Sequence, residues 1–299
     1  MTRMLRDSVA GWRADYAPSM GAALSYYMIF SIAPLLVIVI AIAGLAFGAE
    51  AASGAIFEQM RGMVGDSGAA AIQGLVKSAS RPATSIFAAA LGLVTLLLGA
   101  TTVLGELQTA LDRIWRAPPV TQRGWWRLLR DRMLSFGMIL VIGFLLLVSL
   151  VLSAAIVAIG DWWGPWFGKM RWLLEAANFA VSFVVVTALF AMIYKMLPRV
   201  RIAWRDVWIG AAVTALLFTA GKFLIGLYIG KSGVSSGFGA AGSVVVLLVW
   251  VYYSAQIFLL GAEFTWVYAR TYGSMKDSKD AIDANPSPTR DVPLAHNER

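Results

Sequence analysis

The stretch GAALSYYMIFSIAPLLVIVIAIAGLAFG, residues 21–48, decides the fold class of this chain. It lies within a run from 16 to 49 that contains no charged residue. A helix needs about 20 mostly apolar residues to cross about 30 Å of hydrocarbon. The run is long enough for this, and it exceeds the roughly 7–15 apolar residues of a signal-peptide core. It therefore predicts a membrane-spanning helix.

Four further runs, 82–105, 133–160, 176–194 and 232–262, contain no charged residue, and the apolar segment 207–230 contains only Lys222. Apolar residues occupy every face of these segments, whereas barrel strands alternate apolar and polar positions. Of the 299 residues, 59% are hydrophobic and only 14% are charged, which is unlike a soluble domain. We predict an all-α polytopic membrane protein, a bundle of six transmembrane helices with short amphipathic interfacial helices. The spans are expected at about 22–48, 83–111, 133–160, 176–197, 207–230 and 241–263.

Lysine and arginine are distributed unevenly between the segments that flank these spans. The segments 1–21, 112–132, 195–206 and 263–299 hold 18 of them, and the loops on the other side hold 6. Basic residues accumulate on the cytoplasmic side of a membrane, so both termini are predicted to be cytoplasmic.

The segments outside the spans have their own predictions. Residues 1–21 are expected to form an interfacial helix on the cytoplasmic face, ahead of a membrane domain at 22–270. Residues 50–80 predict one or two short amphipathic helices on the outer surface. The polar tail, 271–299, is expected to be disordered.

Composition argues against most catalytic chemistry. The chain has no cysteine, and its one histidine, His296, lies in the tail. Zinc sites of the Cys/His type and Ser–His–Asp triads are thereby excluded, and we expect neither a metal nor a cofactor. The net charge of +8 is spread over membrane-flanking segments. This favours contact with anionic lipid headgroups over binding of nucleic acid; whether the chain forms a homo-oligomer stays open.

Lys222 is the charge placed deepest in a predicted span, about 22 Å from the cytoplasmic boundary at 1.5 Å per residue. One interpretation is that its side chain snorkels to the outer headgroups. The other is that it faces a polar cavity together with the Ser- and Gly-rich segment 231–243. In that case Lys222 with Ser235, Ser236 and Ser243 would bind an anionic headgroup.

Glu106 and Glu263 are carboxylates near the cytoplasmic ends of their spans. Each either pairs with a nearby arginine or contributes to a polar stripe that faces a substrate. Gln256, Tyr252 and Tyr253 precede Glu263 on the same span and would extend that stripe.

The first span carries Tyr26, Tyr27 and Pro34. The tyrosines either form an aromatic belt at the membrane interface or direct one ring towards the carboxylates. Pro34 predicts a helix kink. Glycines spaced four residues apart, such as Gly226 and Gly230, predict close helix contacts at the outer ends of spans.

Three blocks of sequence resemble the YihY/virulence factor BrkB family of bacterial inner-membrane proteins. They are AALSYYMIFSIAPLLVIVIAIAGLAFG (22–48), LGELQTALDRIW (104–115) and GAAGSVVVLLVWVYYSAQIFLLGAEFTWVYA (239–269). The resemblance implies six spans, cytoplasmic termini and the inner membrane, with no established activity. The family was once labelled a ribonuclease, but these residues contain no evident nuclease site. The positions that match the family blocks and have no known role are Ser25, Tyr26, Tyr27, Pro34, Gly242, Ser243, Tyr252, Tyr253, Gly261 and Glu263.

Three functions remain open from the sequence. The first is transport or translocation of an anionic, lipid-like or envelope-related amphipathic substrate, without catalysis. The second is a non-transporting scaffold that recruits envelope partners. The third is a membrane-embedded hydrolase built on carboxylates and a metal.

Overall fold

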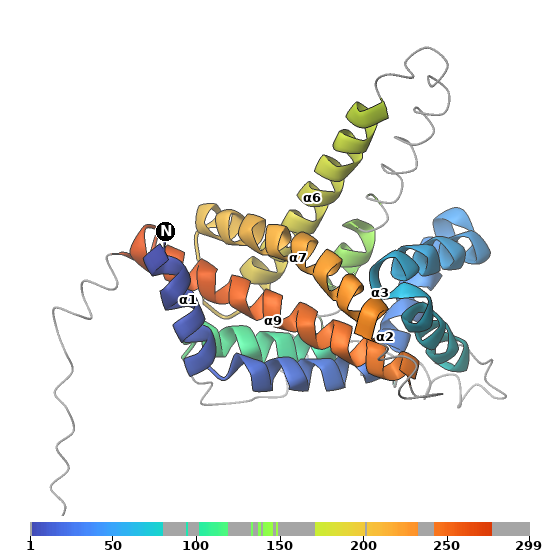
Figure 1. Cartoon of the computed structure of the whole chain (residues 1–299), viewed down its shortest axis with the longest axis horizontal. Coiled ribbons are helices and arrows are strands. Elements are labelled where there is room, and N and C mark those ends of the chain that lie inside the picture. Colours follow the sequence, from blue (N-terminus) through green and yellow to red (C-terminus); the bar gives the residue numbers. More distant parts are fainter. Residues whose placement is uncertain are drawn as a thin grey trace, which may run out of the picture.

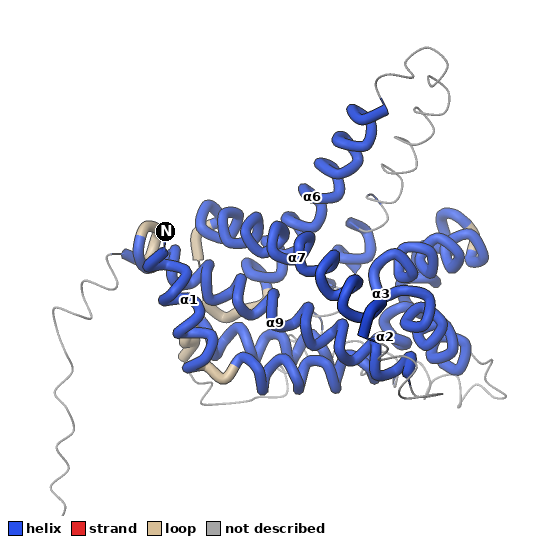
Figure 2. Tube along the Cα trace, in the orientation of Figure 1, coloured by secondary structure: helices blue, strands red, loops and turns tan. Residues whose placement is uncertain are grey.

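Helices make up all the regular structure in the part of the chain that the computed structural model describes (Figure 2). That part comprises residues 2–79, 94, 102–118, 133, 137–138, 140–145, 148, 171–200, 202–232 and 242–276. The named helices are α1 (Thr2–Ala14), α2 (Ala17–Phe47), α3 (Ala49–Ala79), α6 (Arg171–Met196), α7 (Trp204–Ser232) and α9 (Gly242–Thr271). The all-helical prediction is confirmed.

Four of these helices are long and apolar enough to cross a membrane. They are the segments Ala17–Leu45, Ala176–Met196, Trp204–Tyr228 and Val244–Thr271, and they match four of the predicted spans. Most of the spans predicted at 83–111 and 133–160 lies outside the described residues, although 102–114 and 140–145 are helical. The tail beyond 276 also lies outside them. The count of six spans therefore stays a prediction.

α1 and α2 meet at a sharp corner. Tyr16 adopts a left-handed backbone conformation with φ of 57°, and the Asp15 N–H donates to the Gly11 carbonyl at 2.8 Å. A left-handed conformation costs a non-glycine residue about 1–2 kcal/mol. The corner places α1 beside the C-terminal end of α9 (Figure 1).

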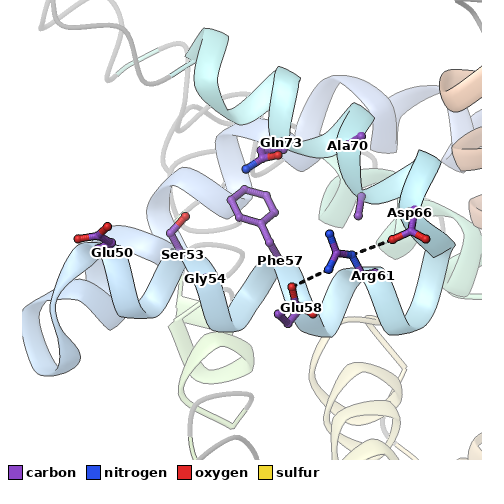
Figure 3. Close-up of a pocket in the computed structure, with 10 residues that line it drawn as sticks. Glu50, Ser53, Gly54, Phe57, Glu58, Arg61, Asp66, Ala70 and Gln73 are labelled. Atoms are coloured by element: carbon purple, nitrogen blue, oxygen red, sulfur yellow. Dashed lines mark hydrogen bonds and ion pairs between the residues drawn. The ribbon is translucent and has the colours of Figure 1, made fainter.

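α2 continues through Pro34 as one helix to Phe47. The next helix, α3, has 31 residues and is longer than the short helices expected at 50–80. Its ribbon turns back on itself between Arg61 and Asp66, so that two arms face each other (Figure 3). The second arm is buried along Ala69, Ile72 and Val76, which pack against residues of α2 and α9.

α7 and α9 run antiparallel and approach closely through paired glycine and threonine residues. A Cβ added to Gly261 would lie closer than 3.0 Å to the Thr214 side chain, and one added to Gly210 would meet Thr265 in the same way. Each threonine hydroxyl donates to the carbonyl four residues earlier on its own helix at 2.7 Å. The threonines therefore leave no polar group unpaired at this crossing, and small residues let the backbones come together.

Two aromatic residues attach neighbouring segments to the backbone of α9. Tyr194 of α6 is fully buried, and its hydroxyl donates to the Phe258 carbonyl at 2.7 Å. The Trp115 indole N–H donates to the Ala262 carbonyl at 3.1 Å. α9 thus lies at the centre of the largest buried cluster, while the N-terminal end of α6 projects away from it (Figure 1).

The close helix contact predicted at Gly226 is not seen among the described residues, because a Cβ added there would meet none of their atoms within 4 Å. The close approaches of α7 occur at Gly210 and at Gly221, which lies against Tyr253 and Ile257.

We predict that Gly261→Ala lowers the free energy of unfolding by about 1–3 kcal/mol, because the added methyl group overpacks the α7–α9 crossing against Thr214. Gly226→Ala is the matched control and should raise stability by about 0.5–1 kcal/mol, because alanine favours a helix over glycine. Thermal unfolding in detergent, followed by tryptophan fluorescence, measures both. Unfolding midpoints of the two variants that shift in the same direction would contradict the close packing of Thr214 against Gly261.

Candidate functional site

Gln256 and Glu263 lie two helical turns apart on one face of α9, which is turned towards α1 and α2. Both lie within the segment Val244–Thr271 that could cross a membrane. Glu263 is only 2% exposed, although an ionisable side chain in such a segment costs several kcal/mol unless it is paired or hydrated. This face therefore contains the most unusual polar groups in the described structure.

Glu263 is enclosed by α1 and by residues 102–118. A Cβ added to Gly11 would lie 2.7 Å from Glu263 Oε2, so a larger residue there would displace the carboxyl group. The charged groups that act on this carboxyl are Asp15 and Arg116. The Oε1 atom is buried without a hydrogen-bond partner among the described residues.

Gln256 has a similar environment against α2. Its amide nitrogen lies so close to Gly21 that any side chain there would collide with it. Both Nε2 and Oε1 of Gln256 are buried without a partner in the described structure. The neighbouring Ser25 hydroxyl does not help, since it donates to the Gly21 carbonyl at 2.8 Å.

Trp12 Nε1 and Asp15 Oδ2 are also buried without a partner in the described part of the chain. We refer to Trp12, Asp15, Gln256 and Glu263 as the polar track. A buried polar atom without a partner costs about 1–3 kcal/mol, and such atoms in native proteins usually bind water, a proton or a ligand. The polar track can therefore donate to and accept from a polar group that enters the bundle.

Ser31 Oγ, Asn178 Oδ1 and Trp250 Nε1 are also buried without a hydrogen-bond partner in the described structure. Two other carboxylates of the bundle do have partners. The Asp206 carboxylate accepts from the backbone N–H and the hydroxyl of Ser274, both at 2.7 Å. Asp112 accepts from the Arg199 backbone and pairs with its guanidinium at 3.2 Å. These contacts join loops to helices, so we assign them a structural role.

The remaining residues that the sequence singled out do not join the polar track. Tyr26 is 60% exposed and packs against Tyr27 with ring centroids 5.5 Å apart, as expected of an interfacial belt. Tyr252 is exposed, and Tyr253 lies against Gly221 between α7 and α9. Glu106 is half-buried on the helical segment 102–114.

Lys222 is exposed on α7 beside the exposed side chains of Phe223 and Leu224. This position favours the snorkelling interpretation over a cavity. Ser235 and Ser236 lie outside the described residues, as does the side chain of Ser243. The described structure thus offers no support for the proposed headgroup site around Lys222.

Sequence reasoning missed Gly11, Trp12, Asp15 and Gly21. Asp15 carried one available signal, since it is the last charged residue before the uncharged run that begins at residue 16. A carboxylate at the start of a span lies where it can contact a neighbouring span. The two glycines gave no signal, because the side chains they accommodate are more than 200 positions away.

The cleft between the two arms of α3 is a weaker candidate (Figure 3). Its volume is about 410 Å³. Arg61 forms an ion pair with Glu58 on its own arm at 2.9 Å and with Asp66 beyond the bend at 2.8 Å. All three side chains are more than half exposed, and exposed ion pairs contribute only about 0–1 kcal/mol. No buried polar group points into the cleft from the residues described.

Comparison with known proteins gives a consistent result. The family model described as Virulence factor BrkB matches residues 8–285. A UPF0761 membrane protein of Tolumonas auensis is 31% identical over 212 residues, covering 67% of this chain and 64% of that protein. A UPF0761 membrane protein of Verminephrobacter eiseniae is 26% identical over 263 residues, covering 85% of this chain and 59% of that protein. The UPF0761 membrane protein YihY of Salmonella typhimurium is 29% identical over 201 residues, covering 66% of this chain and 64% of that protein.

The chain thus spans between 59% and 64% of the length of these relatives. No solved structure matches it.

We predict that Gln256→Leu leaves the free energy of unfolding unchanged or raises it by about 1 kcal/mol, because leucine removes two buried polar atoms that lack partners. Gln108→Leu is the matched control. The Gln108 amide donates to the Leu197 carbonyl at 2.9 Å, so its loss should cost about 1 kcal/mol. Thermal unfolding of both variants in detergent checks this, and a clear loss of stability in Gln256→Leu would show that its amide is satisfied.

Proposed function

The chain belongs to the virulence factor BrkB family of multi-pass integral membrane proteins, and from that premise we propose that it translocates an anionic, lipid-like substrate across the bacterial inner membrane. We expect the α1 end of the bundle, and with it both chain termini, on the cytoplasmic side. The basic segments that the sequence gathers on that side support this orientation. The proposal assigns a carrier role without a catalytic step.

The observation that supports translocation is the polar track within a membrane-crossing helix. Hydrocarbon contains no water to satisfy polar groups, and a static bundle gains stability by replacing them with apolar residues. The amide atoms of Gln256 and the side chain of Glu263 are nevertheless buried on α9. A passing headgroup would supply hydrogen bonds to these atoms as it moves, which a scaffold does not require.

The charge and shape of the substrate follow from the groups around the track. Arg116 acts on Glu263, and Arg113 lies over the Tyr16 ring at 5.4 Å. These cations at the α1 end attract anions. The exposed rings of Tyr26 and Phe30, with centroids 5.0 Å apart, offer an apolar surface on α2 for acyl chains. An anionic headgroup with an apolar tail matches both features.

We predict that the purified protein, reconstituted in liposomes, speeds the movement of fluorescent phosphatidylglycerol between leaflets. A membrane-impermeant quencher added outside reports the fraction of probe that becomes accessible. Gln256→Leu should reduce the protein-dependent rate about tenfold, because a hydrogen bond to a charged group contributes about 1.5–3 kcal/mol. Gln73→Leu, on the exposed side of α3, is the matched control and should retain the rate.

Two results would count against this function. A folded protein that accelerates neither the phosphatidylglycerol probe nor a zwitterionic one would favour the scaffold. Equal rates of lipid movement for Gln256→Leu and the unaltered chain would show that translocation does not use the polar track.

A further inference from the structure

α1 lies across the C-terminal part of α9 (Figure 1). Gly11 sits directly on the Glu263 carboxyl group. Ser8, one helical turn earlier, is only 1% exposed. The Glu263 carboxyl group therefore lies at the contact between α1 and α9.

That carboxyl group meets a second one. Asp15, at the corner between α1 and α2, interacts directly with Glu263. An ionised carboxylate can only accept hydrogen bonds, so two of them cannot bond to each other unless one carries a proton. One oxygen of each group, Glu263 Oε1 and Asp15 Oδ2, is buried and has no donor among the described residues.

The positive charge nearby does not neutralise both groups. Asp15 faces Glu263 from the α1–α2 corner, and Arg116 acts on it from the segment 102–118. Arg116 is exposed, so water screens its charge. Arg113, over the neighbouring Tyr16 ring, is exposed as well. Two ionised carboxylates at a buried contact would therefore still repel each other, because water screens both guanidinium groups.

We propose that Asp15 and Glu263 form a proton-binding site, in which one proton shared between the two carboxyl groups keeps α1 docked on α9. In the docked state one carboxyl O–H donates to the other carboxylate. When the proton passes to water, both groups are anionic and repel each other, and α1 separates from α9. In the proposed function, this proton would be the ion coupled to translocation. Only that coupling role rests on the proposed function, and the proton site itself does not.

The docking of α1 can be measured without any transport assay, because the chain contains no cysteine. Ser8→Cys places a thiol at a position that docking buries, and Ala10→Cys places one at an exposed position of α1. The protein in nanodiscs is reacted with a maleimide reagent from pH 5 to pH 9. The ratio of the two rates cancels the intrinsic pH dependence of thiol reactivity and reports exposure of Ser8→Cys alone.

We predict that this ratio rises about tenfold as the pH increases, because loss of a charge-assisted hydrogen bond contributes about 1.5–3 kcal/mol to undocking. Glu263→Gln should keep the ratio low at every pH, since its amide donates to Asp15 permanently. Asp15→Asn, at the less buried partner, should do the same and serves if Glu263→Gln does not fold. Glu58→Gln, an exposed carboxylate of α3, is the matched control and should keep the full pH dependence.

A ratio that does not change with pH in the unaltered chain would overturn the proposal. Retention of the pH dependence in both Glu263→Gln and Asp15→Asn would also overturn it. A pH-dependent ratio in a protein that moves no lipid would leave the proton site standing and remove only the translocator, so the two proposals fail separately.

Discussion

Close contact between α7 and α9 is the constraint on which the described structure depends. Gly210 and Gly261 each receive a threonine from the opposite helix, and the threonine hydroxyls are satisfied within their own helices. In a bilayer, lipid tails are as apolar as the side chains, so helices associate through close packing and hydrogen bonds. The crossing supplies that packing. α6 and residues 102–118 then attach to the carbonyl groups of α9 through Tyr194 and Trp115.

The same helix carries two kinds of polar contact. At the crossing with α7, both threonine hydroxyls have hydrogen-bond partners, and these contacts contribute to stability. Towards α1 and α2, the side chains of Gln256 and Glu263 retain buried atoms without partners in the described structure. Native proteins rarely tolerate such atoms where nothing binds them. α9 therefore joins a rigid face to a face suited to exchanging protons or polar groups.

Individual residues show how far sequence reasoning reached. Gln256 and Glu263 were placed on one polar stripe, and the structure puts them on one buried face, since residues seven apart lie almost in line on a helix. The tyrosines of the proposed stripe diverge from it, because neighbouring residues point about 100° apart. Glycine spacing alone pointed to Gly226, which no described residue approaches, while close contacts form at Gly210 and Gly221. Spacing along one helix cannot identify which of its faces a partner helix covers.

The sequence by itself determined that this chain is helical and belongs in a membrane. Long uncharged runs leave backbone groups that only a helix satisfies in hydrocarbon, so these properties follow from local composition. Only the tertiary structure decided that Asp15 meets Glu263 and that Lys222 faces outward. The reason is physical, because the burial of a side chain depends on the rotation of its helix against its neighbours. That rotation is set by contacts between residues far apart in the chain, such as Gly11 with Glu263 and Thr214 with Gly261.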